Sequence, residues 1–153
     1  MNRVEQAIIL AIEAHSGQKD KLGKDYFWHV LAVSKMGSNE DEQIVGALHD
    51  VLEDCTSYWK NRAETFCDGY NQLTALRLLS RVNRDGTKKD TEDYYKDIRE
   101  NPLALAVKAN DIAHNTSSER MNELPTEDRK RLKEKYDKAR EALGLKQWWE
   151  NII

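Results

Sequence analysis

The sequence predicts an all-α fold, arranged as a compact helical bundle, and three observations support that class. Apolar residues recur at the three- and four-residue spacing of a helix face, no segment alternates as a half-buried strand would, and no internal repeat is visible. A chain of 153 residues also has the usual size of one domain. We therefore expect a single domain over residues 1–153 with one core.

The first two predicted helices lie on either side of a charged loop. Apolar spacing predicts a helix over Arg3–Ser16 that ends at Gly17, and a second helix over Tyr26–Met36. The segment between them holds two glycines and several charges, which is typical of a loop. The expected face of the first helix consists of Val4, Ala7, Ile8, Ala11, Ile12 and His15.

A third helix is predicted to begin after a capping pair. Asn39 and Glu42 stand three positions apart, as in a capping box, and the mostly apolar helix that follows ends near Asp54. Two further helices are predicted over Tyr58–Phe66 and Tyr70–Leu79.

The next part of the chain is punctuated by turn and cap signals. We interpret Asn83–Lys89, which contains Asp85-Gly86, as a loop and not a hairpin, because no strands flank it. Asp90 or Thr91 can cap a helix that runs to Ile98. Pro102 fits the first turn of another helix, which reaches Asp111.

The last predicted helix is long and charged. Pro125 and Thr126 open it, and Glu134 and Lys138 are spaced for an i,i+4 ion pair. The chain then closes with apolar side chains that we expect to pack on the core, with a second subunit as the alternative, because chain ends need tying down. These residues are Trp148, Trp149, Ile152 and Ile153.

Composition narrows the function classes. The 24 basic and 27 acidic residues give a net charge of −3, which supplies no general field for a nucleic-acid backbone. The apolar run Ala7–Ile12 is too short for a signal core or a membrane span. Cys55 and Cys67 form no CxxC pair. We expect a cytoplasmic protein that binds neither nucleic acid nor membranes.

The most informative segment is His49-Asp50-Val51-Leu52-Glu53-Asp54, which places four polar groups in an otherwise apolar helix. Adjacent residues of a helix point about 100 degrees apart, so His49 and Asp50 can approach one cation from neighbouring directions. Glu53 lies one turn from His49, and Asp54 one turn from Asp50. We therefore expect both carboxylates to reach the same cleft.

Two further segments offer ligands of the same kind. His29 lies within the second predicted helix, and Asp111 lies in an apolar helical segment with His114 and Asn115 close behind it. Together with His49 and Asp50, they provide two imidazoles and two carboxylates from three helices. Such a mixed nitrogen and oxygen set suits manganese, iron or another divalent first-row metal.

The order of these motifs resembles the HD superfamily of metal-dependent phosphohydrolases. Within it, the chain resembles the hydrolase domain of the Rel/Spo alarmone enzymes and the small alarmone hydrolases. The matching pieces are Ala14-His15-Ser16-Gly17-Gln18, Lys21-Leu22-Gly23 with Tyr26, His29, Ala47–Asp54, and Lys108-Ala109-Asn110-Asp111 with His114-Asn115.

The resemblance implies an HD-domain helical bundle with a defined site. It implies a divalent metal, expected to be Mn²⁺, on His29, His49, Asp50 and Asp111. It implies catalytic roles for Glu53 and Asp54 toward the attacking water, and contacts to the nucleotide from Lys21 and Asn115. The implied reaction removes the 3′-pyrophosphate from (p)ppGpp- or (p)ppApp-like nucleotides.

Several positions depart from the family pattern. Arginines that the family usually carries near the nucleotide are replaced by Asp20, by Ile112, and by Thr116 or Ser117, and usual prolines by Asp25 and Val30. The metal set survives these changes, whereas the base stays open. Two other functions remain: an HD phosphohydrolase of another nucleotide, of the nucleoside monophosphatase type, or a binding module without turnover. The intact His-Asp-x-x-Glu-Asp segment counts against the last.

Three residues near the motifs have open roles. His15 is interpreted as a packing residue or as support for a ligand. His114 either supports the metal site or faces the substrate, and Lys108 either offsets phosphate charge or pairs with Asp111.

Overall fold

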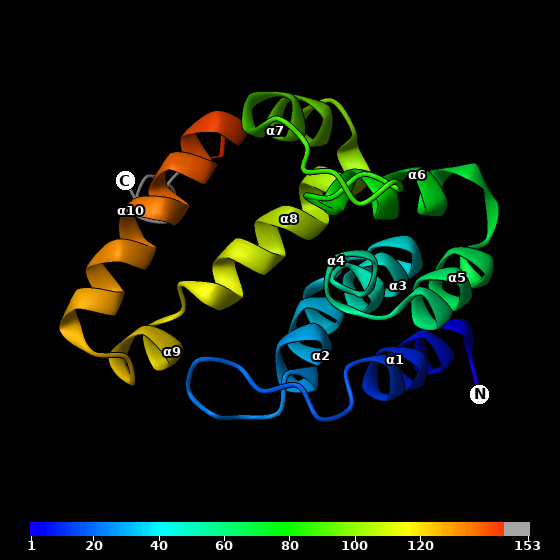
Figure 1. Cartoon of the computed structure of the whole chain (residues 1–153), viewed down its shortest axis with the longest axis horizontal. Helices are drawn as coiled ribbons and strands as arrows, with labels where there is room; N and C mark the ends of the chain where they lie inside the picture. Colours follow the sequence, from blue (N-terminus) through cyan, green and yellow to red (C-terminus); the bar gives the residue numbers. More distant parts are fainter. Residues whose placement is uncertain (146–153) are drawn as a thin grey trace.

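The computed structural model describes residues 1–145, which form helices joined mostly by short connections (Figure 1). The helices are α1 (Arg3–Ala14), α2 (Phe27–Met36), α3 (Glu40–Leu48), α4 (Val51–Asp54), α5 (Ser57–Phe66), α6 (Gly69–Leu79), α7 (Thr91–Arg99), α8 (Pro102–Asn115), α9 (Ser118–Asn122) and α10 (Thr126–Leu143). The predicted all-α class is confirmed. Over the described range, β-pairing is limited to two isolated bridges, Lys19 with Asp25 and Val82 with Lys88.

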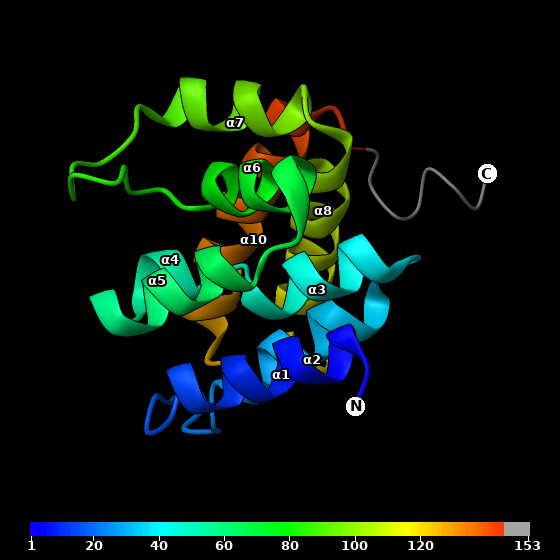
Figure 2. The same ribbon diagram turned by 90° about the vertical axis from the view of Figure 1, so that its right-hand side faces the viewer.

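Two helices, α3 and α8, organise the bundle. α3 packs against α1, α2, α6 and α8, and α8 also contacts α7, α9 and α10. Figure 2 shows α1, α3, α6 and α7 at successive levels, with α8 and α10 crossing them. None of the helices within residues 1–145 is both long and apolar enough to cross a bilayer.

The core has two clusters, and α3 contributes to both. Ile44 and Leu48 of α3 join the first cluster, with buried residues of α1, α2, α5 and α6. Val45 joins the second cluster, with buried residues of α6, α7, α8 and α10. Full burial of each such aliphatic side chain contributes about 1.5–3 kcal/mol. α3 is therefore held from two sides, and its C-terminal end has a fixed position.

The backbones of α2 and α3 lie close together at Gly46. A Cβ atom at this position would lie 3.2 Å from the Cα of Ser34 and 3.2 Å from the carbonyl oxygen of Val33. The Ser34 hydroxyl donates a hydrogen bond to the Gln43 carbonyl oxygen across the same contact, at 2.7 Å. Because backbone atoms of α2 surround this point, a side chain at 46 requires the two helices to separate.

The N-terminal helices differ from the prediction at their ends. α1 stops at Ala14, with His15 as its C-cap, and Ile12 is 39% exposed at the edge of the predicted buried face. Asn39 caps α3 by accepting from the N–H of Glu42.

The helix expected to run through Asp54 is divided, because α3 ends at Leu48 and α4 begins at Val51. In an unbroken helix, the Gly46 carbonyl oxygen would accept a hydrogen bond from the N–H of Asp50. Here it instead lies 2.6 Å from Nδ1 of the His49 ring and accepts from that ring. The prediction of one continuous helix here was wrong.

The C-terminal part agrees with prediction at its loop and departs from it further on. Asn83–Lys89 forms a loop, as predicted, with Gly86 at a φ of +88° and one isolated bridge between Val82 and Lys88. α8 runs to Asn115, and the short helix α9 was not predicted. The predicted ion pair on α10 was wrong in its partners: Lys133 and Asp137 form it, at 2.8 Å. The closing residues Trp148, Trp149, Ile152 and Ile153 lie outside the described residues.

Candidate metal centre

Four side chains predicted as metal ligands converge in the structure. His29, His49, Asp50 and Asp111 each offer one ligand atom, and these atoms all lie within 4.8 Å of one another. The side chains of His29, His49 and Asp111 are at most 9% exposed, and that of Asp50 is 17% exposed. They come from α2, the α3–α4 junction and α8, so three distant segments meet at one point.

The His49 ring is oriented by the backbone of its own helix. Its Nδ1–H donates to the Gly46 carbonyl oxygen, which directs Nε2 toward the carboxylates. Nε2 lies 2.9 Å from Asp50 Oδ2 and 3.3 Å from Asp111 Oδ1, yet it is buried without a well-aligned hydrogen bond. A buried nitrogen in this position is costly unless a cation or a proton occupies the space in front of it.

The His29 ring is held between a ligand and a second histidine. Its Nε2 lies 2.8 Å from Asp111 Oδ1, and its Nδ1 lies 2.7 Å from Nδ1 of His114. Burial first, and then the nearby His29, lower the pKa of His114 to about 4. A neutral His114 can accept the Nδ1–H of His29, which leaves Nε2 of His29 free to bind a metal.

Asp111 is fixed by two residues on its own helix. Lys108 Nζ donates to Oδ2 at 3.0 Å, and Asn115 Nδ2 donates to Oδ1 at 3.1 Å. Burial opposes the charge of Lys108, yet Asp111 raises the pKa of that lysine. Of the two roles left open for Lys108, the structure shows the pairing with Asp111.

Asp50 is oriented from α2 by a residue to which the sequence reading assigned no role. The Tyr26 hydroxyl donates to Asp50 Oδ2 at 2.6 Å. Burial and the charge of Asp50 raise the pKa of Tyr26, so the phenol remains a donor at neutral pH. The signal for this residue was its place three positions before His29, at the start of the same helix.

The charge balance of the cluster favours a cation. Burial alone would lower the pKa of His49, but Asp50 and Asp111 raise it well above the usual value. The same pair of carboxylates therefore attracts positive charge to the point where the four ligand atoms meet. Two imidazole nitrogens and two carboxylate oxygens are a suitable set for a divalent first-row metal. The residues present thus fit a divalent metal.

The two predicted catalytic carboxylates lie beside the cluster, on α4. Asp54 is exposed at its surface, but partial desolvation, followed by the charges of Asp50 and Glu53, raises its pKa to about 7. Glu53 is half-buried, and its Oε2 accepts from the backbone N–H of Arg81 at 3.4 Å. The charge of Asp50 thus acts on Asp54, and Glu53 reaches toward the segment that follows α6.

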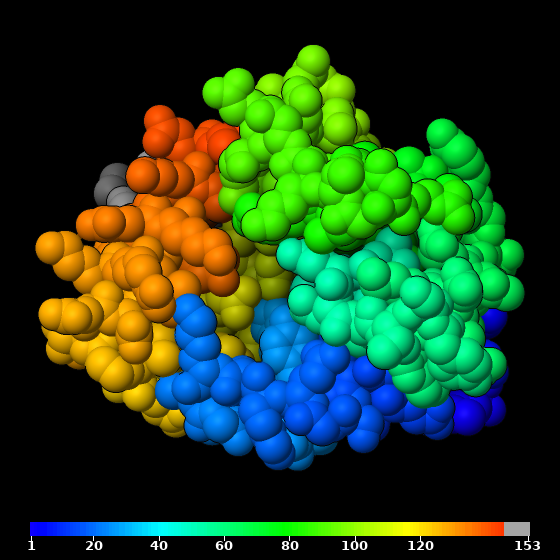
Figure 3. Space-filling model, viewed as in Figure 1, coloured from blue at the N-terminus to red at the C-terminus, as the bar shows by residue number. Residues whose placement is uncertain are grey.

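The predicted nucleotide contacts lie on a neighbouring cavity. Lys21 and Asn115 both line a cavity of 290 Å³, together with Arg120, Lys135 and Tyr136. Figure 3 shows the molecule hollowed between α10 and α4, with α8 and α2 at the bottom of the hollow. Asn115 thus links the cavity to the metal cluster through its bond to Asp111. It is also the last residue of α8.

Arg120 was not predicted as a site residue. It projects from α9, is 21% exposed at its side chain, and lies 3.5 Å from the Asp20 carboxylate. Asp20 also accepts from the N–H groups of Leu22 and Lys24, so its carboxylate is occupied by loop contacts. Arg120, which comes from a distant segment, thus pairs with the residue that stands where the family pattern has an arginine. No local pattern could reveal this pairing.

His15 lies outside the ligand set. It is buried, its Nδ1 pairs with Gln18 Oε1 at 2.8 Å, and its ring packs 5.1 Å from the ring of Tyr26. Burial lowers the pKa of His15. Of the two roles left open for His15, these contacts show packing, against the ring of Tyr26.

Comparisons with known proteins identify relatives of one type. The chain is 26% identical over 159 residues to the bifunctional (p)ppGpp synthase/hydrolase SpoT of Escherichia coli, covering 95% of this chain and 21% of that protein. It is 29% identical over 134 residues to the putative chloroplastic GTP diphosphokinase RSH1 of Oryza sativa, covering 75% and 15%. It is 24% identical over 123 residues to the guanosine-3′,5′-bis(diphosphate) 3′-pyrophosphohydrolase of Aquifex aeolicus, covering 75% and 17%.

These relatives are much longer than this chain, which spans about a fifth or less of their length. A scan of family models gives no match. The resemblance to Rel/Spo proteins that the motifs predicted is confirmed by the relatives.

Proposed function

We propose that this chain is a divalent-metal-dependent phosphohydrolase that removes the 3′-pyrophosphate from a guanosine or adenosine alarmone. The observation that carries the proposal is the convergence of His29, His49, Asp50 and Asp111, whose ligand atoms lie within 4.8 Å of one another and whose side chains are each oriented by a neighbouring group. The similarity to proteins named guanosine-3′,5′-bis(diphosphate) 3′-pyrophosphohydrolases supplies the substrate class. We further propose that Mn²⁺ is the metal and that residues 1–153 act as one domain.

The four ligands would hold the cation with His29 and His49 in their neutral forms. A divalent cation bound there would polarise a phosphoryl oxygen and lower the pKa of a water molecule. Tyr26 and Lys108 keep the two carboxylates in position through bonds of 2.6 and 3.0 Å. The protein therefore supplies a preformed set of ligands, which lowers the reorganisation needed for reaction.

Asp54 is the proposed base. A carboxylate with a pKa near the working pH can take a proton from the attacking water and release it again. Water then adds to the phosphorus attached to the ribose 3′ oxygen and the P–O bond to that oxygen breaks. The 3′ oxygen takes up a proton to become a hydroxyl group, and the released pyrophosphate keeps the oxygen of the water. Glu53 would assist by orienting the water, because it is anchored at the Arg81 N–H beside Asp54.

The cavity next to the cluster suits the nucleotide. Four basic residues and one carboxylate, that of Asp20, line it; the basic residues are Lys19, Lys21, Arg120 and Lys135. Tyr136 offers a ring against which a base can pack. We propose that Lys21 contacts a phosphate and that Asn115 contacts the nucleotide while it steadies Asp111.

A nucleotide panel tests this function. Full-length protein loaded with Mn²⁺ is incubated with guanosine and adenosine alarmones, with nucleoside monophosphates and with no substrate, and the released ions are quantified. Pyrophosphate from an alarmone is the expected result. Inorganic phosphate from monophosphates would support the monophosphatase alternative instead, and no release from any nucleotide would support a binding module. The metal content of the same preparation, measured by elemental analysis, checks the proposed ligand set independently.

A further inference from the structure

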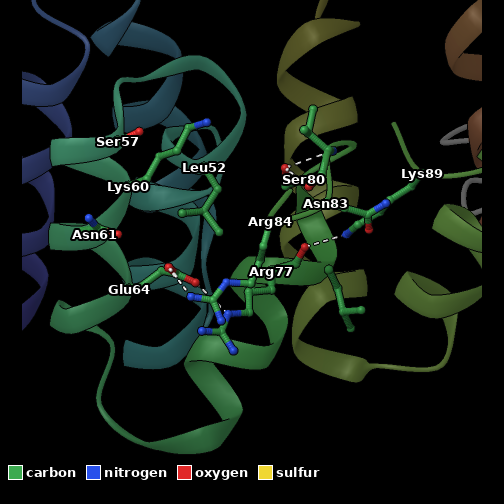
Figure 4. A pocket seen from close by; sticks show the side chains of 12 residues that line it. Leu52, Ser57, Lys60, Asn61, Glu64, Arg77, Ser80, Asn83, Arg84 and Lys89 are labelled. Carbon is green, nitrogen blue, oxygen red and sulfur yellow. Dashed lines mark hydrogen bonds and ion pairs between the residues drawn. The ribbon is translucent and has the colours of Figure 1, made fainter. Parts of the chain in front are cut away.

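A second pocket lies between α5, α6 and the loop of residues 80–89, and it shares no lining residue with the metal cluster or the 290 Å³ cavity. Its volume is 370 Å³, within the range of about 300–1,000 Å³ typical of small-molecule sites. Figure 4 shows Glu64 of α5 facing Arg77 and Arg84, with Lys60 on the same helix and Lys89 on the far side. Nothing in the proposed hydrolysis uses these residues.

The pocket is strongly cationic in a chain whose net charge is −3. Four basic side chains line it, namely Lys60, Arg77, Arg84 and Lys89, and Glu64 is the one carboxylate of the lining. Arg77 Nε donates to Glu64 Oε2 at 2.7 Å, and Arg84 Nη2 lies 3.7 Å from Glu64 Oε1. Glu64 therefore serves two guanidinium groups, and two positive charges of the lining have no carboxylate within it.

The lysines are held where an anion can reach them. Lys89 Nζ donates one hydrogen bond to the Arg77 carbonyl oxygen at 2.7 Å, which leaves two of its donors for a ligand. Burial lowers the pKa of Lys89, so a bound anion would stabilise its charged form. Lys60 is half-buried on α5, and within residues 1–145 it forms no ion pair closer than 4.0 Å.

The helix that forms one wall adds to this field. Ser57, Lys60, Asn61 and Glu64 occur at the spacing of one helix face, and Ser57 is the first residue of α5. No acidic residue lies in the first turn of α5, so the positive end of its dipole is not neutralised from within the helix. The apolar part of the lining, Leu52, Leu78 and Val82, offers a surface for a base or a ribose.

We propose that this pocket is a second, non-catalytic site for a phosphate-bearing anion, either pyrophosphate or the diphosphate of a nucleotide. Guanidinium groups, a lysine and neutral amide donors around one concavity are the groups that recognise phosphate oxygens. The site stands on its own geometry and does not depend on the hydrolytic activity.

Calorimetric titration of the full chain, stripped of metal with a chelator, tests the site. Inorganic pyrophosphate and guanosine 5′-diphosphate are the two probes. The pocket variant carries Lys60→Glu and Arg84→Glu. The control variant carries Lys130→Glu and Lys138→Glu on the exposed side of α10, which makes the same charge change and touches neither pocket. Circular dichroism and thermal melting confirm that each variant folds. If the charge-reversed pocket variant does not fold, a variant with Lys60→Gln and Arg84→Gln takes its place.

We expect saturable binding by wild type and control, with affinity reduced at least about tenfold in the pocket variant. Tighter binding of guanosine diphosphate identifies a nucleotide as the occupant, and equal binding identifies pyrophosphate. An equal loss of affinity in the pocket and control variants would show that only net charge matters, and it would overturn the proposal. Unchanged binding in the pocket variant, or no binding by the wild type, would overturn it as well. All of these outcomes are independent of turnover, so a failure here is distinct from a failure of the proposed hydrolase function.

Discussion

The metal cluster and the rim of the neighbouring cavity are built in different ways. Cluster residues stand on helices that the two core clusters hold, and each is oriented by a second buried contact. The rim joins the loop between α1 and α2 to α9 through Asp20 with Arg120 and Lys24 with Glu123. The pair of Lys24 with Glu123 is about half exposed, and exposed ion pairs contribute little to the stability of the fold.

This difference separates two properties of the protein. Metal binding should depend on buried contacts that tolerate little change, whereas nucleotide selection should depend on a rim that can change without disturbing the metal. Variants at the two places therefore give different signatures.

Asp111→Ala is expected to have the largest effect. Bound metal and activity should disappear together, and the free energy of unfolding should fall by about 3–5 kcal/mol, because Lys108 is left as a buried, unpaired charge. Elemental analysis and chemical denaturation measure the two losses. The double variant Lys108→Met with Asp111→Ala should regain much of the stability and none of the metal. Wild-type metal content in Asp111→Ala would disprove the ligand assignment.

Asp54→Asn should reduce kcat by about 10²–10⁴-fold while the metal content stays at the wild-type level. The amide keeps the shape of the side chain but cannot accept the proton of the water. Glu53→Gln should also retain metal and lose rate, as expected for a group that orients the water. Steady-state kinetics on metal-quantified protein provides the measurement. Metal loss in either variant would place that residue among the ligands.

His114→Ala tests whether the cluster is held by its supporting contacts. It should weaken metal affinity by about 10–100-fold, because His29 loses the partner that fixes its ring. His15→Phe is the matched control, since His15 is also buried but pairs with Gln18 and not with a ligand. Competition with a chromogenic chelator measures both affinities. Equal effects of the two substitutions would show that His114 contributes only packing.

Arg120→Gln should give the smallest effect, an increase in KM of about tenfold with kcat nearly unchanged. Lys24→Gln is the control, because the ion pair of Lys24 with Glu123 connects the same two segments and neither residue lines the cavity. A fall in kcat with unchanged KM would contradict the assignment of Arg120 to nucleotide binding.

The sequence was sufficient for the helices and for the four converging side chains. Apolar periodicity located nearly all helices, and the rarity of polar residues such as His49 and Asp50 inside a buried run marked the cluster. Both signals are local, and local signals are recoverable from one sequence.

What the sequence did not predict depends on contacts between distant segments. The division of the helix at His49 arises from a ring that binds the carbonyl of Gly46, and the role of Tyr26 depends on a carboxylate 24 positions away. Arg120 lies on a helix of five residues with no buried side chain, too short for a periodic pattern. The positions of the rim residues depend on the conformation of loops, and the periodicity of apolar residues does not predict loop conformation.

Gly46 allows α2 and α3 to pack closely beside the two imidazole ligands. The His29 and His49 rings, whose centroids lie 5.4 Å apart, are carried by helices that touch where this residue has only a hydrogen atom. Adding a methyl group there would widen the gap that a metal ion must bridge, although position 46 binds no ion itself. A substitution at position 46 would therefore change the ion size that the site prefers, although this residue does not contact the ion.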